Sequence, residues 1–363
     1  MKTVKIAMIG VGCISGIYLD NITKVFKEIE LIGVCDLVRE RAENAQKNYG
    51  VPKIYETMHD AFADPEVDIV LNITRAYQHY DVTRAALLAG KNVYSEKPLA
   101  TTLEQGVELI RIAREKGLML GGAPDTFLGA GIQTCKQIID AGFIGRPLAA
   151  TAFMMSHGVE TWHPDPEFFY KPGAGPMLDM GPYYTTALIY LLGPVDSLCA
   201  MTQQSFETRV ATCKEKKGLV IQVETPTYVA GTLRFKSGAT ATMVMSFETL
   251  YSTHPCIEIY GEKGTLTVPD PNTFGGPVVL YRPEEGAARE VPLMAPYKEN
   301  SRALGLSKMA EALESGKGDF VTSWRLTGHA LDVMTGMLRS GEKGETVRML
   351  DLEQATNPGE TKK

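Results

Sequence analysis

A glycine-rich segment near the amino terminus is the first pattern with chemical meaning. In GVGCISG, Gly10 and Gly12 are followed by Cys13, Ile14 and Ser15, directly after a continuous apolar run. Glycines at this spacing allow a tight turn and a close approach of the backbone to a pyrophosphate, and Ser15 stands where a third small residue suffices. A helix that begins here would direct its N–H groups toward the phosphates. We therefore expect Gly10, Gly12, Cys13 and Ile14 to contact a dinucleotide.

An acidic residue follows at the distance that this pattern requires. Asp36 lies 20 residues after Gly16, at the end of the second predicted strand. A carboxylate there accepts hydrogen bonds from the adenosine ribose hydroxyls and repels a 2′-phosphate, which favours NAD over NADP. Arg41 is near enough in sequence to reach a phosphate, so NADP is less favoured rather than excluded. The simpler interpretation, a glycine turn and a helix-capping Asp, leaves the order of strand, turn, helix, strand and acid unexplained.

The first part of the chain alternates between short apolar runs and amphipathic segments. The runs suit central strands of a parallel sheet, and the amphipathic segments suit helices that cover it. Repeated units of this kind predict a doubly wound Rossmann domain with right-handed crossovers over residues 1–124. The predicted strands are 4–9, 31–35, 67–73, 92–95 and 118–120, and the predicted helices are 15–27, 38–47, 80–88 and 103–115.

The pattern changes after residue 124. Alternating polar and apolar stretches appear, and tight turns at 236–238 and 262–264 predict hairpins. We expect an α+β domain over 125–363, for substrate binding and oligomerisation, with an open, largely antiparallel sheet and helices on one face. The last helices are candidates to pack back on the first domain, and the tail after Asp351, which includes 358–363, is expected to be frayed. The predicted strands are 148–155, 228–235, 239–247, 256–260 and 265–268, and the predicted helices are 127–141, 177–192, 304–313 and 324–338.

Composition excludes several classes of protein. The chain has 363 residues, whereas single cores usually stop growing at roughly 250 residues, which favours two domains. A net charge of −6 argues against a nucleic-acid or anionic-membrane partner, because such binding depends on basic patches. No apolar run reaches the ~18 residues of a membrane span. The six cysteines are widely spaced, without a CxxC or Cys/His cluster, so we expect reduced thiols in a cytoplasmic protein and no metal site.

Three further segments carry a specific resemblance. They read AGKNVYSEKPLA at 89–100, IIDAGFIG at 138–145 and GAGPMLDMGPYY at 173–184. Together with the Rossmann start, they resemble the Gfo/Idh/MocA family, which includes glucose–fructose oxidoreductase and inositol dehydrogenase. The resemblance covers nearly the whole chain. It implies hydride transfer between NAD(P) and a hydroxyl carbon of a sugar, inositol or similar polyol.

The resemblance assigns catalytic roles to three residues. Lys97, in the Glu-Lys-Pro sequence, would act as acid or base on the reacting hydroxyl, since a buried lysine near an oxidised nicotinamide should have a lowered pKa. Asp179 would hydrogen-bond a substrate hydroxyl. Tyr183 replaces the usual histidine of the family's Asp-x-Gly-x-His, and at i+4 it is expected to share a helix face with Asp179. Either Lys97 or Tyr183 would accept the proton, and packing is the alternative role for Tyr183.

The family's Thr-Pro motif after the fourth strand is also altered. Residues 72–79 read NITRAYQH, so the resemblance places Asn72, Thr74 and His79 beside the cofactor. Glu96 and Lys97 are expected on the same side of the cofactor. Tyr77 is expected to face the substrate.

An insert at 157–170, HGVETWHPDPEFFY, is rich in aromatic and polar side chains. Aromatic faces stack on the C–H face of sugars, and histidines bind hydroxyls. We therefore expect His157, Trp162 and His163 to contact the substrate. A surface loop with its own small cluster is the alternative.

These observations predict an NAD-dependent dehydrogenase of a sugar, glycoside or polyol, and the Tyr-containing segment favours the pyranose C3 hydroxyl and a 3-keto product. One alternative is an NAD-dependent glycosidase or lyase, in which oxidation at C3 acidifies the neighbouring C–H and NAD is recycled. Another is a non-catalytic NAD-binding regulator that senses sugars. One apolar face of the second sheet predicts a homo-oligomer, either dimer, tetramer or hexamer.

Overall fold

The computed structural model describes residues 3–357 in two compact units, and each unit uses separate stretches of the chain. The first contains the residues up to 125, 300–331 and those from 351 on, and the second contains 126–299 and 332–350. The tail beyond Asp351 begins as a short helix, whereas its end at 358–363 lies outside the described residues. All six cysteines are free thiols.

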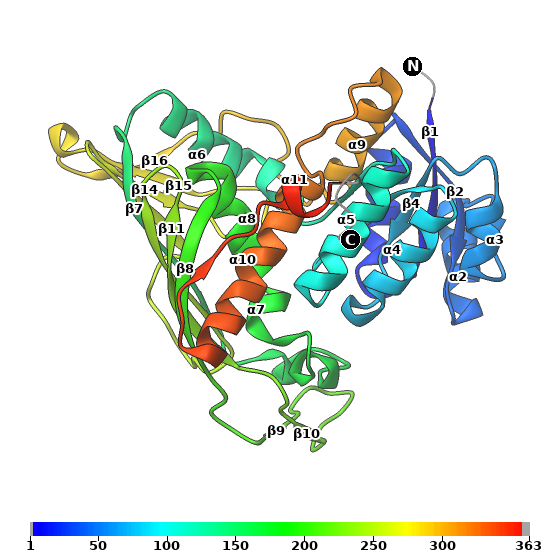
Figure 1. Cartoon of the computed structure of the whole chain (residues 1–363), viewed down its shortest axis with the longest axis horizontal. Coiled ribbons are helices and arrows are strands. Elements are labelled where there is room, and N and C mark those ends of the chain that lie inside the picture. The colour runs from blue at the N-terminus through cyan, green and yellow to red at the C-terminus, as the bar shows by residue number, and fades with distance from the viewer. Residues whose placement is uncertain (1–2, 358–363) are drawn as a thin grey trace. The chain divides into compact units, whose positions relative to one another are not determined.

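The first unit is built on a six-stranded parallel sheet in the order β3-β2-β1-β4-β5-β6, of which Figure 1 labels β1, β2 and β4. Its central strands are almost completely buried, which explains their continuous apolar sequences. The Rossmann prediction is confirmed. The strands are β1 (Val4–Ile9), β2 (Ile29–Cys35), β3 (Lys53–Ile54), β4 (Ile69–Asn72), β5 (Asn92–Ser95) and β6 (Leu120–Gly122), and the helices are α1 (Ser15–Lys24), α2 (Arg39–Tyr49), α3 (Met58–Ala63), η1 (Ala76–Gln78), α4 (His79–Leu88), α5 (Leu103–Glu115), α9 (Leu304–Ser315), the first part of α10 (Trp324–Lys343) and α11 (Leu352–Ala355).

The second unit contains a nine-stranded sheet in the order β16-β15-β14-β13-β7-β12-β11-β8-β17. Only the β7–β12 pair is parallel among these neighbours, so the prediction of a largely antiparallel sheet is confirmed. A separate hairpin pairs β9 with β10. The strands are β7 (Pro147–Met155), β8 (Val195–Gln203), β9 (Thr208–Val210), β10 (Val220–Gln222), β11 (Tyr228–Phe235), β12 (Thr240–Ser246), β13 (Ile257–Gly261), β14 (Thr265–Val268), β15 (Val278–Tyr281), β16 (Ala288–Val291) and β17 (Val347–Arg348).

Helices cover one face of this sheet, as expected. α6 contacts β14 and β15, α8 contacts β7, and the later part of α10 lies against β8, where Ser340 Oγ accepts from Ala200 N at 2.9 Å (Figure 1). The other face carries a row that runs across four paired strands, Met201, Ala230, Val244 and Phe153. Met201 is 81% exposed. The helical segments are η2 (Thr126–Leu128), α6 (Ala130–Asp140), η3 (Val159–Thr161), η4 (Glu167–Tyr170), α7 (Gly175–Asp179), α8 (Gly181–Leu192) and η5 (Pro283–Glu285).

The single helix expected over 177–192 is wrong. α7 ends at Asp179 and α8 begins at Gly181, with Met180 between them. Pro182 has no N–H and therefore cannot donate to Leu178 O, which interrupts the helical ladder. Tyr183 N donates to Met180 O at 3.1 Å instead of continuing the pattern from Asp179. Asp179 and Tyr183 therefore lie on separate helices, and the i+4 argument does not hold.

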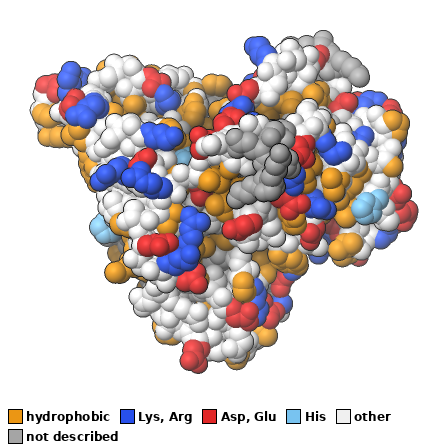
Figure 2. Space-filling model, in the orientation of Figure 1, with side chains coloured by type: hydrophobic (Ala, Val, Ile, Leu, Met, Phe, Trp, Pro, Cys, Tyr) orange, Lys and Arg blue, Asp and Glu red, His pale blue; other side chains and the backbone are white. Residues whose placement is uncertain are grey.

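Charges of both signs are interspersed over the face shown in Figure 2. Neither sign forms a broad patch in that view. This distribution matches the modest net charge of −6.

Candidate functional site

The glycine loop has a geometry that requires glycine at its first position. Gly10 has a φ of +95°, and a Cβ atom added there would lie 2.8 Å from Ile73 O. Residues other than glycine rarely adopt this backbone conformation. The end of the adjacent strand also leaves no space there for a Cβ atom. Gly12 borders open space, and Cys13 and Ile14 are exposed beside it. The loop thus offers an accessible backbone at the start of α1, as a pyrophosphate site requires.

Asp36 fixes this loop to the end of β2. Its Oδ2 accepts from Val11 N at 2.6 Å, and its Oδ1 accepts from Val38 N at 2.7 Å. The Asp36 side chain is only 8% exposed, whereas Arg41 is 53% exposed and approaches Asp36 Oδ1 to 3.9 Å. The carboxylate therefore stands beside the phosphate loop with its charge held in place. These residues fit the adenosine and phosphate groups of NAD.

The loop after β4 is organised by a buried amide. Asn72 is fully buried, its Nδ2 donates to His79 O and Thr83 Oγ1, and its Oδ1 accepts from Thr74 N and Thr74 Oγ1. Its backbone oxygen accepts from Glu96 N at 2.8 Å. The side chain of Asn72 therefore holds the loop together, and its contact with the cofactor stays a prediction.

His79 connects the loops after β4 and β5. It begins α4, is buried, and places Nδ1 2.7 Å from Pro98 O and Nε2 3.1 Å from Thr74 O. Burial lowers the pKa of His79, which favours the neutral imidazole. A neutral ring has one N–H and so donates to one of these carbonyl oxygens. Both ring nitrogens face backbone, so this side chain supports the two loops. Tyr77, predicted to face the substrate, is 54% exposed nearby.

The Glu-Lys-Pro segment follows β5 at the same edge of the sheet as the glycine loop after β1. Glu96 is buried; its Oε1 accepts from Tyr18 OH at 2.7 Å, and its Oε2 accepts from Lys97 N at 2.9 Å. The Lys97–Pro98 peptide is cis, and Lys97 is half-buried. The carboxyl edge of a parallel sheet is where open α/β folds bind their ligands. Lys97 therefore lies at that edge, on a loop that is braced by the hydrogen bonds of Glu96.

Sequence reasoning missed two buried groups near this segment. Tyr18 lies in α1, 78 residues before its partner Glu96, and no local pattern marks the pairing. Asp125 is 1% exposed and its Oδ2 accepts from Gly305 N at 3.0 Å. Burial raises the pKa of Asp125 to about 6. The signal for Asp125 was an acid directly after the apolar segment that ends in Ala123-Pro124, although its partner is 180 residues away.

The second unit holds the other predicted catalytic residues. Asp179, at the end of α7, is half-buried, and Tyr183, in the first turn of α8, is 7% exposed. Gly175 begins α7 with a φ of +77°, and a Cβ there would lie 2.8 Å from Pro226 O. This tight approach sets where α7 starts. The break at Met180 then orients Asp179 and Tyr183 independently.

The insert forms an aromatic cluster in the same unit. His163 makes edge contacts with Trp162, Phe168 and Phe169, with ring centroids 5.4, 5.7 and 4.8 Å apart, and its Nδ1 accepts from Asp165 N at 3.0 Å. Trp162 is 66% exposed, and His157 is also exposed. Segment η4 of the insert contacts α7, which carries Asp179. Within this cluster the Trp162 ring contacts His163 and remains largely exposed.

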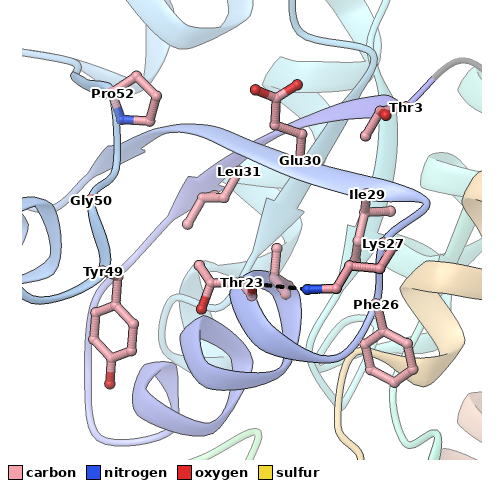
Figure 3. A pocket seen from close by; sticks show the side chains of 11 residues that line it. Thr3, Thr23, Phe26, Lys27, Ile29, Glu30, Leu31, Tyr49, Gly50 and Pro52 are labelled. Carbon is pink, nitrogen blue, oxygen red and sulfur yellow. Dashed lines mark hydrogen bonds between the residues drawn. The ribbon is translucent and has the colours of Figure 1, made fainter.

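A pocket of about 370 Å³ lies at the opposite edge of the first sheet (Figure 3). It is bordered by the starts of β1 and β2, including Thr3 and Glu30, by Lys27 and by the turn at Gly50. It is therefore remote from the glycine loop and is not the candidate site. Between residues 3 and 357, no group of three or more His, Cys, Asp or Glu side chains is placed to hold a metal ion. The helices in this part of the chain are too short or too polar to cross a membrane.

Comparison with known proteins gives the family. Residues 4–122 match the oxidoreductase family with an NAD-binding Rossmann fold, and residues 132–267 match the GFO/IDH/MocA C-terminal domain. The chain belongs to the Gfo/Idh/MocA family of NAD(P)-dependent oxidoreductases, which act on CH–OH groups. The predicted family, fold class, enzyme class and NAD cofactor are thereby confirmed.

Individual relatives agree with this assignment. The myo-inositol 2-dehydrogenase of Thermotoga maritima is 26% identical over 262 residues, which cover 72% of this chain and 74% of that protein. An oxidoreductase domain protein from Kribbella flavida has a TM-score of 0.80 at 18% identity, covering 97% of this chain and all of that one. A levoglucosan dehydrogenase solved with NADH and L-sorbose has a TM-score of 0.79 at 18% identity, covering 97% and 100%. The two structural likenesses concern the fold.

Proposed function

We propose that this protein is an NAD-dependent dehydrogenase of a secondary hydroxyl in a sugar, glycoside or polyol, with C3 of a pyranose as the favoured carbon. The observation that carries the proposal is the braced Glu96–Lys97 loop, at the same sheet edge as a glycine loop that fits a pyrophosphate. The myo-inositol and levoglucosan dehydrogenases among its relatives and structural neighbours support this substrate class. We further propose that residues 1–124 bind NAD, that 125–363 bind substrate, and that the protein is cytoplasmic.

A bound NAD would supply the acceptor for the hydride that leaves the hydroxyl carbon. The protein must then remove the hydroxyl proton as the C–H bond breaks. We assign this proton to Lys97 Nζ or Tyr183 Oη. Asp179 would accept a hydrogen bond from a second substrate hydroxyl and so fix which carbon faces the cofactor.

The aromatic insert is assigned to the sugar ring. Trp162 offers an accessible indole that packs edge-on against His163. Such a ring stacks on the C–H face of a pyranose, whereas a histidine binds its hydroxyls. His157 and His163 are the candidates for the latter role.

A turnover screen tests the proposal directly. Myo-inositol, D-xylose, D-glucose, levoglucosan and methyl β-D-glucopyranoside are incubated with NAD, and NADH is followed by absorbance. Net NADH is expected from at least one of them. Cleavage of the glycoside without net NADH would instead indicate the lyase or glycosidase reaction. Binding of NAD without turnover of any compound would indicate the regulator.

Two variants then test the assigned residues. Loss of a positioned acid or base typically costs ~10²–10⁴ in rate, so Lys97→Ala should lower kcat by that order while NAD still binds. Tyr183→Phe removes only the hydroxyl; if Tyr183 carries the proton, it should lose rate nearly as severely, and the double variant should be little worse than either. Near-normal kcat in Tyr183→Phe would restrict Tyr183 to packing. Near-normal kcat in both Tyr183→Phe and Lys97→Ala would defeat the assigned site.

A further inference from the structure

A buried ion cluster links the aromatic insert to two other segments of the second unit. Arg209 of β9 pairs with Glu160 at 3.1 Å and with Glu248 at 2.7 Å, and these side chains are 7%, 4% and 13% exposed. The three residues come from the hairpin, from η3 and from the segment after β12. Charges this deeply buried persist only when they are paired and hydrogen-bonded. The cluster therefore ties three distant segments together.

Further donors complete the cluster. Tyr170 OH donates to Glu160 Oε2, and Thr227 Oγ1 donates to Glu248 Oε1. Arg209 Nη2 also donates to Phe247 O at 2.9 Å, and its Nη1 reaches His157 O at 3.3 Å. A planar guanidinium can serve four acceptors in one fixed arrangement, which the ammonium group of lysine cannot reproduce. Each carboxylate thus has a hydroxyl donor besides the arginine.

The same cluster fixes the start of the aromatic insert. Gly158 has a φ of +104°, and a Cβ there would lie 2.4 Å from Glu160 Oε2. Glu160 O accepts from Thr212 N and Cys213 N at 2.9 and 3.0 Å. Two residues beyond Glu160, the exposed ring of Trp162 begins the aromatic cluster. Side chain and backbone of Glu160 are therefore both anchored immediately before Trp162.

We propose that Arg209, through Glu160 and Glu248, is a positioning residue that holds the 157–170 segment in its substrate-binding conformation and so sets affinity for the sugar. This inference rests on the proposed function. Arg209 itself is buried and does not touch the substrate. Its effect passes through the orientation of Trp162 and His163.

The test measures segment mobility and kinetics in the same variants. The chain has two tryptophans, Trp162 and Trp324, so a Trp324→Phe background makes Trp162 the only tryptophan reporter. Nanosecond anisotropy decay then reports local motion of the segment. Arg209→Gln and Arg209→Lys are compared with Lys171→Gln, a matched change that breaks the exposed ion pair to Glu224.

Arg209→Gln should increase the amplitude of Trp162 motion and raise KM for the best substrate of the screen about tenfold, with kcat changed less. NAD affinity should stay at the wild-type value, Arg209→Lys should be intermediate, and Lys171→Gln should match wild type. If Arg209→Gln does not fold, Tyr170→Phe keeps Arg209 and removes one donor to Glu160. Tyr170→Phe should also increase the motion of Trp162 and raise KM, but by smaller amounts than Arg209→Gln.

Three results would overturn the proposal. Unchanged anisotropy and KM in the folded variants would show that the cluster does not hold the segment. Increased motion with unchanged KM would show that the segment does not bind substrate. A rise in NAD dissociation constant equal to the rise in KM would indicate a general loss of structure. A wild-type protein inactive toward the whole screen would defeat the proposed function, and the anisotropy comparison would still decide whether Arg209 holds Trp162.

Discussion

Asp36 should contribute to both cofactor choice and loop stability, and two substitutions separate these contributions. The carboxylate repels a 2′-phosphate by its charge. It also accepts hydrogen bonds from Val11 N and Val38 N at 2.6 and 2.7 Å. Asp36→Ala removes both functions. Asp36→Asn removes the charge and keeps one oxygen that can accept a hydrogen bond.

The structure gives the expected size of each effect. Val11 is buried, and leaving a buried N–H without an acceptor costs about 1–3 kcal/mol. Val38 is 45% exposed, so water can replace the carboxylate there. Asp36→Ala should therefore lower the free energy of unfolding of the cofactor-free protein by about 1–3 kcal/mol. Asp36→Asn should keep most of this stability. The affinity of the alanine variant for NAD should fall about tenfold for each ~1.4 kcal/mol of binding free energy that is lost.

Calorimetric titration with NAD and NADP, together with urea unfolding of the cofactor-free protein, measures both effects. Asp36→Asn should bring the dissociation constants for NAD and NADP closer together, while its free energy of unfolding stays near the wild-type value. Arg41→Gln is a control, because its exposed guanidinium is 3.9 Å from Asp36 and adds little to stability. A wild-type preference for NADP, or an unchanged ratio in Asp36→Asn, would refute the assignment of cofactor choice to this carboxylate.

Two further predictions concern a buried acid and assembly. Burial raises the pKa of Asp125 from 3.8 to about 6, so the folded protein binds more protons than the unfolded chain between these values. Stability should fall as pH rises through these values, by roughly 3 kcal/mol over the whole titration at 1.36 kcal/mol per pH unit. Asp125→Asn should abolish this loss in urea unfolding at pH 4.5 and 7.5, and an unchanged pH slope would contradict it. Separately, the apolar row that includes Met201 predicts self-association through the second sheet, so sedimentation should show species larger than 39.7 kDa, and Met201→Glu should reduce them. A wild-type monomer at micromolar concentration would rule this interface out.

The sequence predicted the parallel sheet well because burial on both faces leaves an uninterrupted apolar run. β1 and β4 are examples, and their predicted positions differ from the observed ones by two residues or fewer at most ends. β3 was missed because two residues, Lys53 and Ile54, are too few to show periodicity. β8 was missed because Asp196 and Ser197 interrupt its alternation.

The sequence predicts which kind of site the chain forms, but not the hydrogen bonds and ion pairs between its distant residues. The glycine spacing and Asp36 are local signals, since each reflects a requirement of one turn. The helix break between Asp179 and Tyr183 also had a local signal in Pro182, which the expected i+4 pairing overlooked. By contrast, Arg209 and Glu160 are 49 residues apart, and no periodicity in either segment indicates that they meet.

The residues predicted to bind the cofactor are largely bonded to one another. Asp36 holds Val11 of the glycine loop, Asn72 holds Thr74, and His79 joins the loop after β4 to Pro98 beside Lys97. A ligand-binding edge made from separate loops needs such bonds, because each loop alone would lose its geometry to conformational entropy. Loss of activity on substituting any of these side chains therefore has two sources, a missing contact to NAD and a displaced loop. Unfolding measurements on the cofactor-free protein separate them, since only the displaced loop lowers its stability.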